Sequence, residues 1–564
     1  MNLTRHGRRS ILVALALLVQ FVAAGHAGIA HADLPAGASK YVAITPFRLA
    51  DTRPSQGTFG FTPVDNSTLS IDITHRPGVP SNATAAVVNV TMISAGGGGY
   101  MTVWPAGTSR PTTSNVNSDA AGRTIANLAH VKIGANGSIL LYRSVMTFVA
   151  VDLVGVYVPV SAAVPEGRMV TLNTGAKRVL DTRDRGYPVG AGLVTDVDMT
   201  AAGVPTAASA VVVNITAVRA ERGFWTAYTH GQARPNTSTL NIDGAGQTRP
   251  SQAIVPMDGT TKTISVYSER GGHLLVDVVG WFTGTADGAG TDGLFVPSAP
   301  VRKLDTRTLR SLPAWGGSTY EFNTGNAPTL QISAAVMNIT GTAPWDSGFV
   351  TAFPAGFARP NSSNLNITSW PQTIANHAIV RVSTRGASLY TSAGMHMIAD
   401  VAGWYLGTPL ANPGAVPVNP NYSPNKATAV FANKIGLYTA VRSGTNLISI
   451  ADTGVAATWS DLTNVAAPGN VMLFGHRTSY GGIFRYINVL KPCDSFSLIG
   501  SDGHHYNYLV MYTTVTAPYY TTISNIASGY PPVTAQLVAC SKPDGTPTST
   551  SYRIVVTGRL VSVT

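Results

Sequence analysis

The hexapeptide RLADTR at residues 48–53 recurs as RVLDTR at residues 178–183 and as RKLDTR at residues 302–307. Three more markers follow each copy in the same order: an Asn-x-Thr triplet at residues 89–91, 214–216 and 338–340; an Arg-Pro pair at 110–111, 234–235 and 359–360; and a closing Asp-x-x-Gly segment that ends in an aromatic residue at 151–157, 276–282 and 399–405. The period of about 125 residues is too long for a solenoid turn or a propeller blade. It fits a whole domain present three times.

Within each copy, short apolar runs alternate with turns rich in Gly, Pro, Asn and Ser, and no long window shows a helical period. The chain contains 57 Gly and 35 Pro among many Val, Ile, Thr and Tyr, a composition typical of strands joined by tight turns. We therefore expect an all-β protein with three tandem antiparallel β-sandwich or barrel domains. They are called repeat 1 (residues 40–160), repeat 2 (165–285) and repeat 3 (294–406).

The repeated motifs allow more than one interpretation. Asp-Thr-Arg indicates an internal Asp–Arg ion pair beside a turn supported by Thr, and the alternative is a shared ligand or metal site. The closing segment is expected to be a core strand, and the Asn-x-Thr triplets are expected to be strand positions of little functional weight. No nucleophile, acid–base pair or metal-ligand cluster recurs in all three copies. The repeats are therefore interpreted as spacers or binding modules, not catalysts.

The first 32 residues have the layout of a signal peptide. Arg5, Arg8 and Arg9 precede an apolar run at residues 11–24, and Ala-His-Ala at 30–32 is a small-x-small cleavage site before Asp33. The alternative is an uncleaved N-terminal membrane anchor. Both alternatives predict an exported bacterial protein that is secreted or held at the cell envelope.

The formal net charge is +11, although only 12% of the residues are charged, and the positive charges are spread along the chain. A nucleic-acid partner would require a dense basic stripe, which the sequence lacks outside its N-terminus. We expect no nucleic-acid binding. A mild attraction of the repeats to anionic envelope polymers is the hypothesis that remains.

A proline-rich linker is expected at residues 407–425, followed by a last domain at 426–564. In this domain His476, Cys540 and Arg553 each lie at the edge of a predicted strand. A thiol, an imidazole and a guanidinium are the parts of a cysteine acyl-transfer site. No cofactor or metal is expected.

The chain has two cysteines, Cys493 and Cys540. In an exported protein, one disulfide between them is a possible arrangement, and it would prevent Cys540 from acting as a nucleophile. The alternative is a free and activated Cys540 with an incidental Cys493.

The last domain resembles the sortases, and most closely their class E type from high-GC Gram-positive bacteria. The matching segments keep the family's order and are PGNVMLFGHR at residues 468–477, YGGIF at 480–484, YNYLV at 506–510, LVAC at 537–540 and YRIVVTG at 552–558. The repeats resemble β-rich units of secreted actinobacterial proteins.

The resemblance implies a sortase-like β-barrel in which Cys540 is the nucleophile, His476 the general acid and base, and Arg553 the group that binds substrate and the oxyanion. It further implies cleavage of a sorting peptide between Thr and Gly, of the form Leu-Ala-x-Thr-Gly or, as runner-up, Leu-Pro-x-Thr-Gly. The acyl group would pass to a peptidoglycan or pilin amine.

The sequence departs from the family in two places. Ala539 stands where sortases usually carry Thr, and Cys493 takes the place of Gly in a Gly-Asp turn. His504 and His505 fit no catalytic position, and Asp452 and Asp461 are assigned no role. Two other functions stay open: a structural or adhesive surface protein with a degenerate sortase domain, and a cysteine peptidase that uses water as acceptor.

Overall fold

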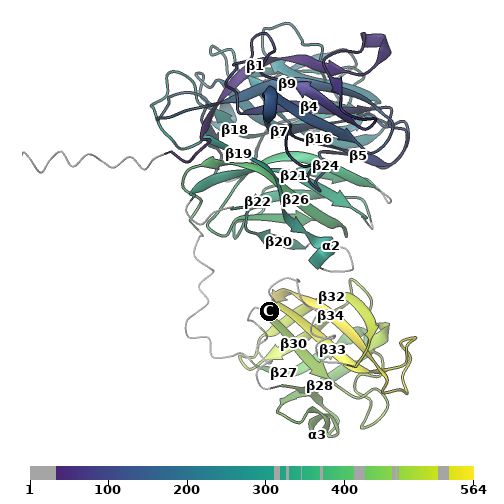
Figure 1. Cartoon of the computed structure of the whole chain (residues 1–564). Helices are drawn as coiled ribbons and strands as arrows, with labels where there is room; N and C mark the ends of the chain where they lie inside the picture. Colours follow the sequence, from purple (N-terminus) through teal and green to yellow (C-terminus); the bar gives the residue numbers. More distant parts are fainter. Residues whose placement is uncertain are drawn as a thin grey trace, which may run out of the picture.

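The structure is a computed structural model. It describes residues 34–173, 175–309, 318–325, 330–344, 346–368, 372–411, 426–459, 465, 469–518 and 533–564. The predicted signal peptide and most of the predicted linker lie outside the described residues, as does Asp461. The regular secondary structure of the described residues is almost entirely β-strand, as expected (Figure 1). No helix in these ranges is long and apolar enough to span a membrane.

Repeat 1 is a sandwich of two antiparallel sheets. The first sheet has the strand order β1 (Ser39–Asp51), β9 (Phe148–Pro159), β4 (Ala85–Ile93) and β7 (Ile125–Lys132). The second has the order β2 (Thr62–Pro63), β3 (Thr68–Asp72), β8 (Ser138–Arg143), β5 (Gly99–Pro105) and β6 (Val116–Ser118). Alternate side chains of both sheets, among them Val88, Leu141 and Val151, are buried in the core between them.

Repeats 2 and 3 have the same design. In repeat 2 the sheets are β10 (Met169–Thr171) and β11 (Lys177–Asp181) beside β18 (His273–Phe282), β13 (Ala210–Ala220) and β16 (Gln247–Pro256), and the four strands β12 (Val194–Asp198), β17 (Thr263–Ser268), β14 (Gly223–Thr229) and β15 (Leu240–Ile242). In repeat 3 they are β19 (Phe295–Asp305), β26 (His396–Leu406), β21 (Ile332–Thr342) and β24 (Thr373–Arg381), and β20 (Thr319–Phe322), β25 (Ala387–Thr391), β22 (Gly348–Pro354) and β23 (Leu365–Ile367). The first sheets of repeats 3 and 1 are joined by the antiparallel pair β19–β1, so together they form one eight-stranded sheet. The short helix α2 (Thr306–Leu309) follows β19.

The repeated motifs occupy the same places in all three repeats. Their interpretation as an ion pair beside a turn and as strand positions is confirmed. In each copy the Asp of Asp-Thr-Arg accepts hydrogen bonds from the backbone N–H and the guanidinium of the Arg that follows it. The Thr hydroxyl accepts the backbone N–H of the closing strand, as Thr52 does from Val149 at 2.7 Å. The closing segments lie in the buried strands β9, β18 and β26, and the Asn-x-Thr triplets lie in β4, β13 and β21.

The three repeats share a further core of their own, which the sequence did not lead us to expect. Tyr157, Phe282 and Tyr405 pack together there with apolar residues from all three first sheets. Because this core includes side chains from every repeat, the repeats form one body instead of three independent beads.

A chain of hydrogen bonds crosses this shared core. Nδ1 of His377 lies 2.8 Å from Oε1 of Gln252, Nε2 of His377 lies 2.9 Å from Nδ1 of His130, and Nε2 of His130 lies 3.0 Å from the Tyr157 hydroxyl. Burial lowers the pKa of His377 to about 3 and holds the pKa of His130 well below its ordinary value. Both imidazoles are therefore neutral at pH 7, and each ring nitrogen has at least one hydrogen-bond partner, Nε2 of His130 lying also 3.5 Å from the Tyr405 hydroxyl.

The last domain is a closed barrel with the strand order β27 (Ala427–Ala432), β28 (Leu437–Ser443), β29 (Ala456–Thr458), β30 (Gly469–Phe474), β33 (Val533–Ser541), β34 (Tyr552–Val563), β32 (His505–Thr516) and β31 (Ser495–Gly500). The helix α3 (Leu447–Ala451) lies between β28 and β29. Short 3₁₀ turns occur in the barrel domain at Asn433–Ile435 and Ile487–Val489. Similar turns occur in the repeats at Pro54–Gln56, Ala135–Gly137 and Thr200–Ala202. The barrel is filled by apolar side chains such as Val430, Leu473 and Leu537.

Candidate active site

Two parallel strands carry the predicted acid–base residue and the predicted nucleophile to the same edge of the barrel. Strands β30 and β33 pair in register, with Phe474 opposite Val538. The pairing continues one residue further, because the Gly475 N–H donates to the Val538 carbonyl at 3.1 Å. His476 and Cys540 each lie two residues beyond the last pair, so neighbouring strands deliver both side chains to one end of the sheet.

The third predicted residue reaches the same place across an antiparallel pair. Cys540 and Arg553 are direct register partners on β33 and β34. Directly opposed residues of an antiparallel pair project from the same face of the sheet, with Cβ atoms about 5 Å apart. The Arg553 guanidinium donates to the carbonyls of Thr550 at 2.8 Å and Tyr552 at 3.0 Å. These contacts fix the guanidinium at the start of β34, and Arg553 and Cys540 line the same pocket.

A pocket of about 220 Å³ is lined by His476, Cys540 and Arg553 together. Its remaining lining is mainly apolar and includes Leu447, Ile448 and Ala451 of α3 together with Trp459, Phe474 and Val538. The site therefore combines a thiol, an imidazole and a fixed cation with an apolar wall that fits an aliphatic side chain of a ligand.

Asp452 is a member of this site that the sequence analysis missed. Its Oδ1 lies 2.8 Å from Nε2 of His476, and Asp452 is placed there by α3, whose last turn it caps with its backbone N–H. The sequence analysis, which assigned Asp452 no role, did not anticipate this contact with His476. A carboxylate 24 residues before the histidine has no recognisable spacing, so only the tertiary structure reveals the pair.

Arg477 is a second neighbour whose contacts the sequence did not indicate. Its side chain is almost fully buried, and its guanidinium donates to the Gly545 carbonyl and to Asn488 Oδ1, both at 2.8 Å, and to the Arg485 carbonyl. It thus ties the loop between β33 and β34 to the segment after the histidine. Burial lowers the pKa of Arg477, and the nearby Cys540 sulfur acts in the opposite direction.

Close packing fixes the backbone just before the histidine. A Cβ on Gly475 would lie 2.8 Å from Cδ2 of Phe484 and 2.9 Å from Cδ1 of Ile483, closer than side chains tolerate. The His476 carbonyl accepts the Phe484 N–H at 2.9 Å. The centroid of the His476 imidazole lies 5.1 Å from that of the Tyr480 ring. Glycine at 475 therefore permits the close approach that holds His476 in place.

Both cysteines are free, so the disulfide alternative is wrong for this structure. Cys493 is exposed in the turn before β31, as expected, and adopts a φ of 76°. His505 lies at the start of β32 with its ring against Phe431, and His504 lies 3.3 Å from Asp502. Within the described ranges, no three His, Cys, Asp or Glu side chains gather as a metal site would require.

Comparison with known families assigns this barrel. Residues 431–561 match the family model whose description is Sortase domain. These residues form a sortase domain. The sortase domain includes His476, Cys540, Arg553 and the two residues that the sequence analysis missed, Asp452 and Arg477.

Solved structures similar to the sortase domain come from several bacteria. Sortase E1 from Streptomyces coelicolor, with a tripeptide in its active site, is 22% identical over 25% of this chain and 90% of its own, with a TM-score of 0.22. A sortase E variant from Streptomyces avermitilis (23% identity, 25% and 90% coverage, TM-score 0.20) and Listeria monocytogenes sortase A (23%, 24% and 88%, 0.20) also match. Because these TM-scores are low, the sortase domain is assigned by the family model. No curated protein matches the chain.

Proposed function

We propose that the protein is an exported cysteine transpeptidase of the sortase type. It cleaves a sorting-signal peptide between Thr and Gly through a thioester on Cys540, and it transfers the acyl group to an amine of the cell envelope. The observation that supports this function best is the single pocket lined by Cys540, His476 and Arg553 inside a sortase domain.

Each group in the pocket has one task in this reaction. The Cys540 thiol gives its proton to His476, and the thiolate attacks the Thr carbonyl of the donor peptide. Arg553 stays charged throughout and stabilises the oxyanion that forms on that carbonyl. When the C–N bond breaks, His476 gives the proton to the leaving Gly amine, and the acyl group remains on sulfur as a thioester.

The second half of the reaction reverses these steps with a new amine. The acceptor amine attacks the thioester carbonyl, His476 takes its proton, and the Cys540 sulfur leaves as the thiolate and is reprotonated. Asp452 acts through His476 and is a positioning residue. With Nε2–H donated to Asp452, the Nδ1 atom is the nitrogen available for the proton exchange.

The apolar wall of the pocket supports a donor that carries an aliphatic side chain, such as the Leu of the proposed motif. Leu-Ala-x-Thr-Gly is the proposed donor motif, with Leu-Pro-x-Thr-Gly as the runner-up. The proposed acceptors are a peptidoglycan stem-peptide amine and a pilin lysine. In this proposal the repeats hold the exported enzyme at the envelope.

Thioester capture tests the proposal. The chain from Asp33 onward is incubated with each donor peptide, and its intact mass is measured with and without a small amine, for the wild type, Cys540→Ala and the matched control Cys493→Ala. We expect an acyl adduct in the wild type and in Cys493→Ala, absent from Cys540→Ala, and discharged faster by the amine.

Two other outcomes would contradict the proposal. An adduct that water discharges as fast as the amine would identify a cysteine peptidase. No adduct with either donor peptide, although Cys540 reacts with a small alkylating reagent, would favour a structural or adhesive surface protein with a degenerate sortase domain.

A further inference from the structure

Two pockets lie at junctions between repeats, and both are built from the motifs that repeat in the sequence. One, of about 200 Å³, joins Arg48, Arg53 and Thr91 of repeat 1 to Arg234 of repeat 2. The other, of about 370 Å³, joins the equivalent residues of repeat 3 to those of repeat 1: Arg302, Arg307, Thr340 and Arg110. Each pocket thus combines the hexapeptide and Asn-x-Thr of one repeat with the Arg-Pro loop of the next.

The asparagine of Asn-x-Thr crosses each junction in the same way. Asn89 donates to the Ser238 carbonyl at 2.5 Å, Asn338 to the Ser114 carbonyl at 2.6 Å, and Asn214 to the Ser363 carbonyl at 2.9 Å. The Asn89 bond runs from repeat 1 to repeat 2, the Asn338 bond from repeat 3 to repeat 1, and the Asn214 bond from repeat 2 to repeat 3. The ring of repeats is therefore closed, and its third junction is built like the two that hold the pockets.

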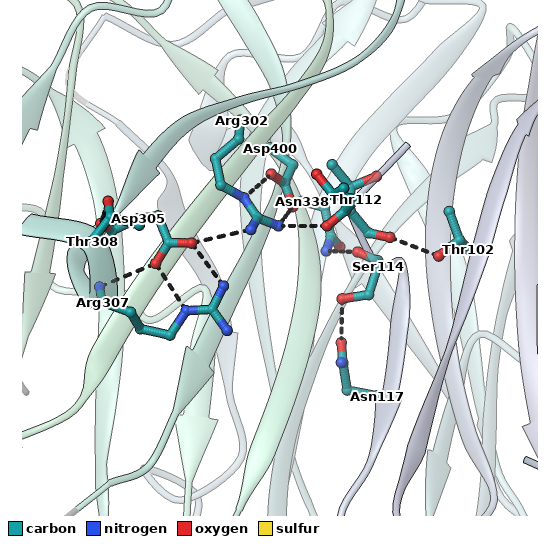
Figure 2. A network of polar contacts seen from close by, with 11 residues as sticks. Thr102, Thr112, Ser114, Asn117, Arg302, Asp305, Arg307, Thr308, Asn338 and Asp400 are labelled. Atoms are coloured by element: carbon teal, nitrogen blue, oxygen red, sulfur yellow. Dashed lines mark hydrogen bonds and ion pairs between the residues drawn. The ribbon is translucent and has the colours of Figure 1, made fainter. Parts of the chain in front are cut away.

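Figure 2 shows how the hexapeptide shapes the junction of repeats 3 and 1. Arg302 donates to Asp400 at 2.8 Å and also reaches the Thr112 carbonyl of repeat 1 at 3.2 Å. Asp305 joins Arg302 to Arg307, so two carboxylates balance two guanidinium groups. The ion pairs make this part of the pocket wall rigid and leave it without net charge.

A third arginine adds a positive charge to each junction, and for Arg110 and Arg234 that junction holds a pocket. Arg110 stacks on the ring of Tyr142 at 3.7 Å, Arg234 on Tyr267 at 3.9 Å, and Arg359 on Tyr390 at 4.3 Å. None of these three arginines forms an ion pair with a carboxylate of the described residues, although Arg110, after the hydrogen bonds from Ser67 and Thr68, helps to lower the pKa of Asp65. Stacking holds the flat guanidinium in place while its N–H groups stay available to a ligand.

The pockets also contain buried hydroxyls without a partner. Thr91 lines one pocket and Thr340 the other, with exposed fractions of 4% and 2%, and neither Oγ1 has a hydrogen-bond partner among the residues that the structure describes. Thr113 in the second pocket is in the same situation. A buried hydroxyl left unpaired costs about 1–3 kcal/mol, so these positions favour a ligand that supplies the missing hydrogen bonds.

We propose that the junctions between repeats bind the sugar or polyol units of an anionic polymer, with one negative charge and at least one free hydroxyl per unit. The stacked arginine pairs with the phosphate or carboxylate, and the threonine hydroxyls bond to hydroxyls of the unit. Equivalent junctions around one body let a single polymer occupy more than one site, which raises the overall affinity without new contacts. This site specifies how the repeats would hold the protein at the envelope, and it does not depend on the transpeptidase reaction.

Binding is measured by affinity electrophoresis and calorimetry on the chain from Asp33 onward. The probes are poly(glycerol phosphate), polygalacturonate and, as the neutral control, dextran. We expect binding to one anionic polymer, which identifies phosphate or carboxylate as the charged group, and none to dextran. Binding to neither anionic polymer, or equal binding to dextran, would overturn the proposal.

Matched charge variants separate the pockets from general electrostatic attraction. Arg110→Gln/Arg234→Gln/Arg359→Gln removes the stacked arginines, and Lys132→Gln/Lys262→Gln/Arg385→Gln removes the same charge from other positions, one in each repeat. The pocket variant should bind about tenfold or more weakly, and the control within about twofold of the wild type. Equal losses in both variants would mean that net charge alone attracts the polymer.

Thr91→Val/Thr340→Val tests the unpaired hydroxyls and guards against a folding artefact. Because valine keeps the shape and removes a buried unpaired polar atom, the melting temperature should stay the same or rise while polymer affinity falls several-fold. Unchanged affinity would exclude these hydroxyls from the site. Thioester capture should be unaffected in every variant, so failure here is distinct from failure of the transpeptidase proposal.

Discussion

Oδ1 of Asp452 lies 2.8 Å from Nε2 of His476, although the two residues come from different elements of the barrel. Only one ring nitrogen of a neutral imidazole carries a proton, so this contact selects which nitrogen is free to exchange a proton with the thiol. The catalytic histidine of the proposed reaction is thus oriented from α3.

Asp452→Asn should slow acylation by lowering kcat, with little change in KM for the donor peptide. An amide in place of the carboxylate can present its N–H to the ring and select the wrong tautomer. We expect a loss of about tenfold or more, with the 10²–10⁴-fold that general acid–base catalysis supplies as its upper bound. Asp452→Glu should recover part of kcat. A rise in KM alone would show that Asp452 binds substrate instead.

Arg553→Lys should slow acylation by the donor peptide far more than it lowers the reactivity of the Cys540 thiol. Lysine keeps the positive charge but loses the planar array of donors of the Arg553 guanidinium, so we expect a loss of about 10²–10³-fold in kcat, as for an oxyanion donor. The rate at which iodoacetamide alkylates Cys540 is the control. An equal fall in alkylation would mean that Arg553 acts on the thiol and not on the oxyanion.

Arg477→Gln should destabilise the sortase domain. The substitution removes hydrogen bonds from a buried guanidinium to Gly545, Asn488 and Arg485, and hydrogen bonds to charged groups contribute about 1.5–3 kcal/mol each. Calorimetry should show a lower melting temperature for the sortase domain and an unchanged transition of the repeats. Arg442→Gln, which changes an exposed arginine of the same domain, should leave both transitions unchanged.

The repeats should lose stability in acid. The pKa of His377 is about 3 in the folded state and about 6.5 in the unfolded state, so the unfolded state binds more protons between these values. The stability contribution is complete above pH 6.5 and falls as the pH drops toward 3, by up to about 1.4 kcal/mol per pH unit for each such histidine.

Calorimetry at pH 7.5 and 5.0 tests this expectation. The transition of the repeats should move to lower temperature at pH 5.0 in the wild type and less so in His377→Gln, which removes one titrating group. His504→Gln, at an exposed position of the sortase domain, is the control. A wild-type transition that does not move between the two pH values would contradict the expectation.

Features carried by local pattern could be predicted from the sequence. The hexapeptide predicted its own ion pair because Asp and Arg are two residues apart, and the family order of the segments around His476 and Cys540 identified the barrel. Asp452 and Arg477 escaped because their partners are distant in sequence or are backbone carbonyls. The junction pockets escaped because each is assembled from two repeats, so no single copy contains one.

The shared core escaped for a different reason. Leu128, Gln252 and His377 occupy equivalent places, each opposite the asparagine of its own Asn-x-Thr triplet. Comparison of the three copies highlights what they have in common, and at this position they have nothing in common. The residues that join the repeats are therefore the ones that an alignment of the repeats ignores.

Because of these differences at the centre of the ring, each repeat can occupy only one of the three positions. A closed ring of three identical units could be assembled in any order, but here only repeat 3 supplies the imidazole that meets both Gln252 and His130. Exchanging two copies, or deleting one, would leave buried hydrogen-bonding groups without partners among the aromatic rings of the shared core. The three copies have become specialised parts of one folding unit, and a gene that reshuffled them would encode a different and less stable protein.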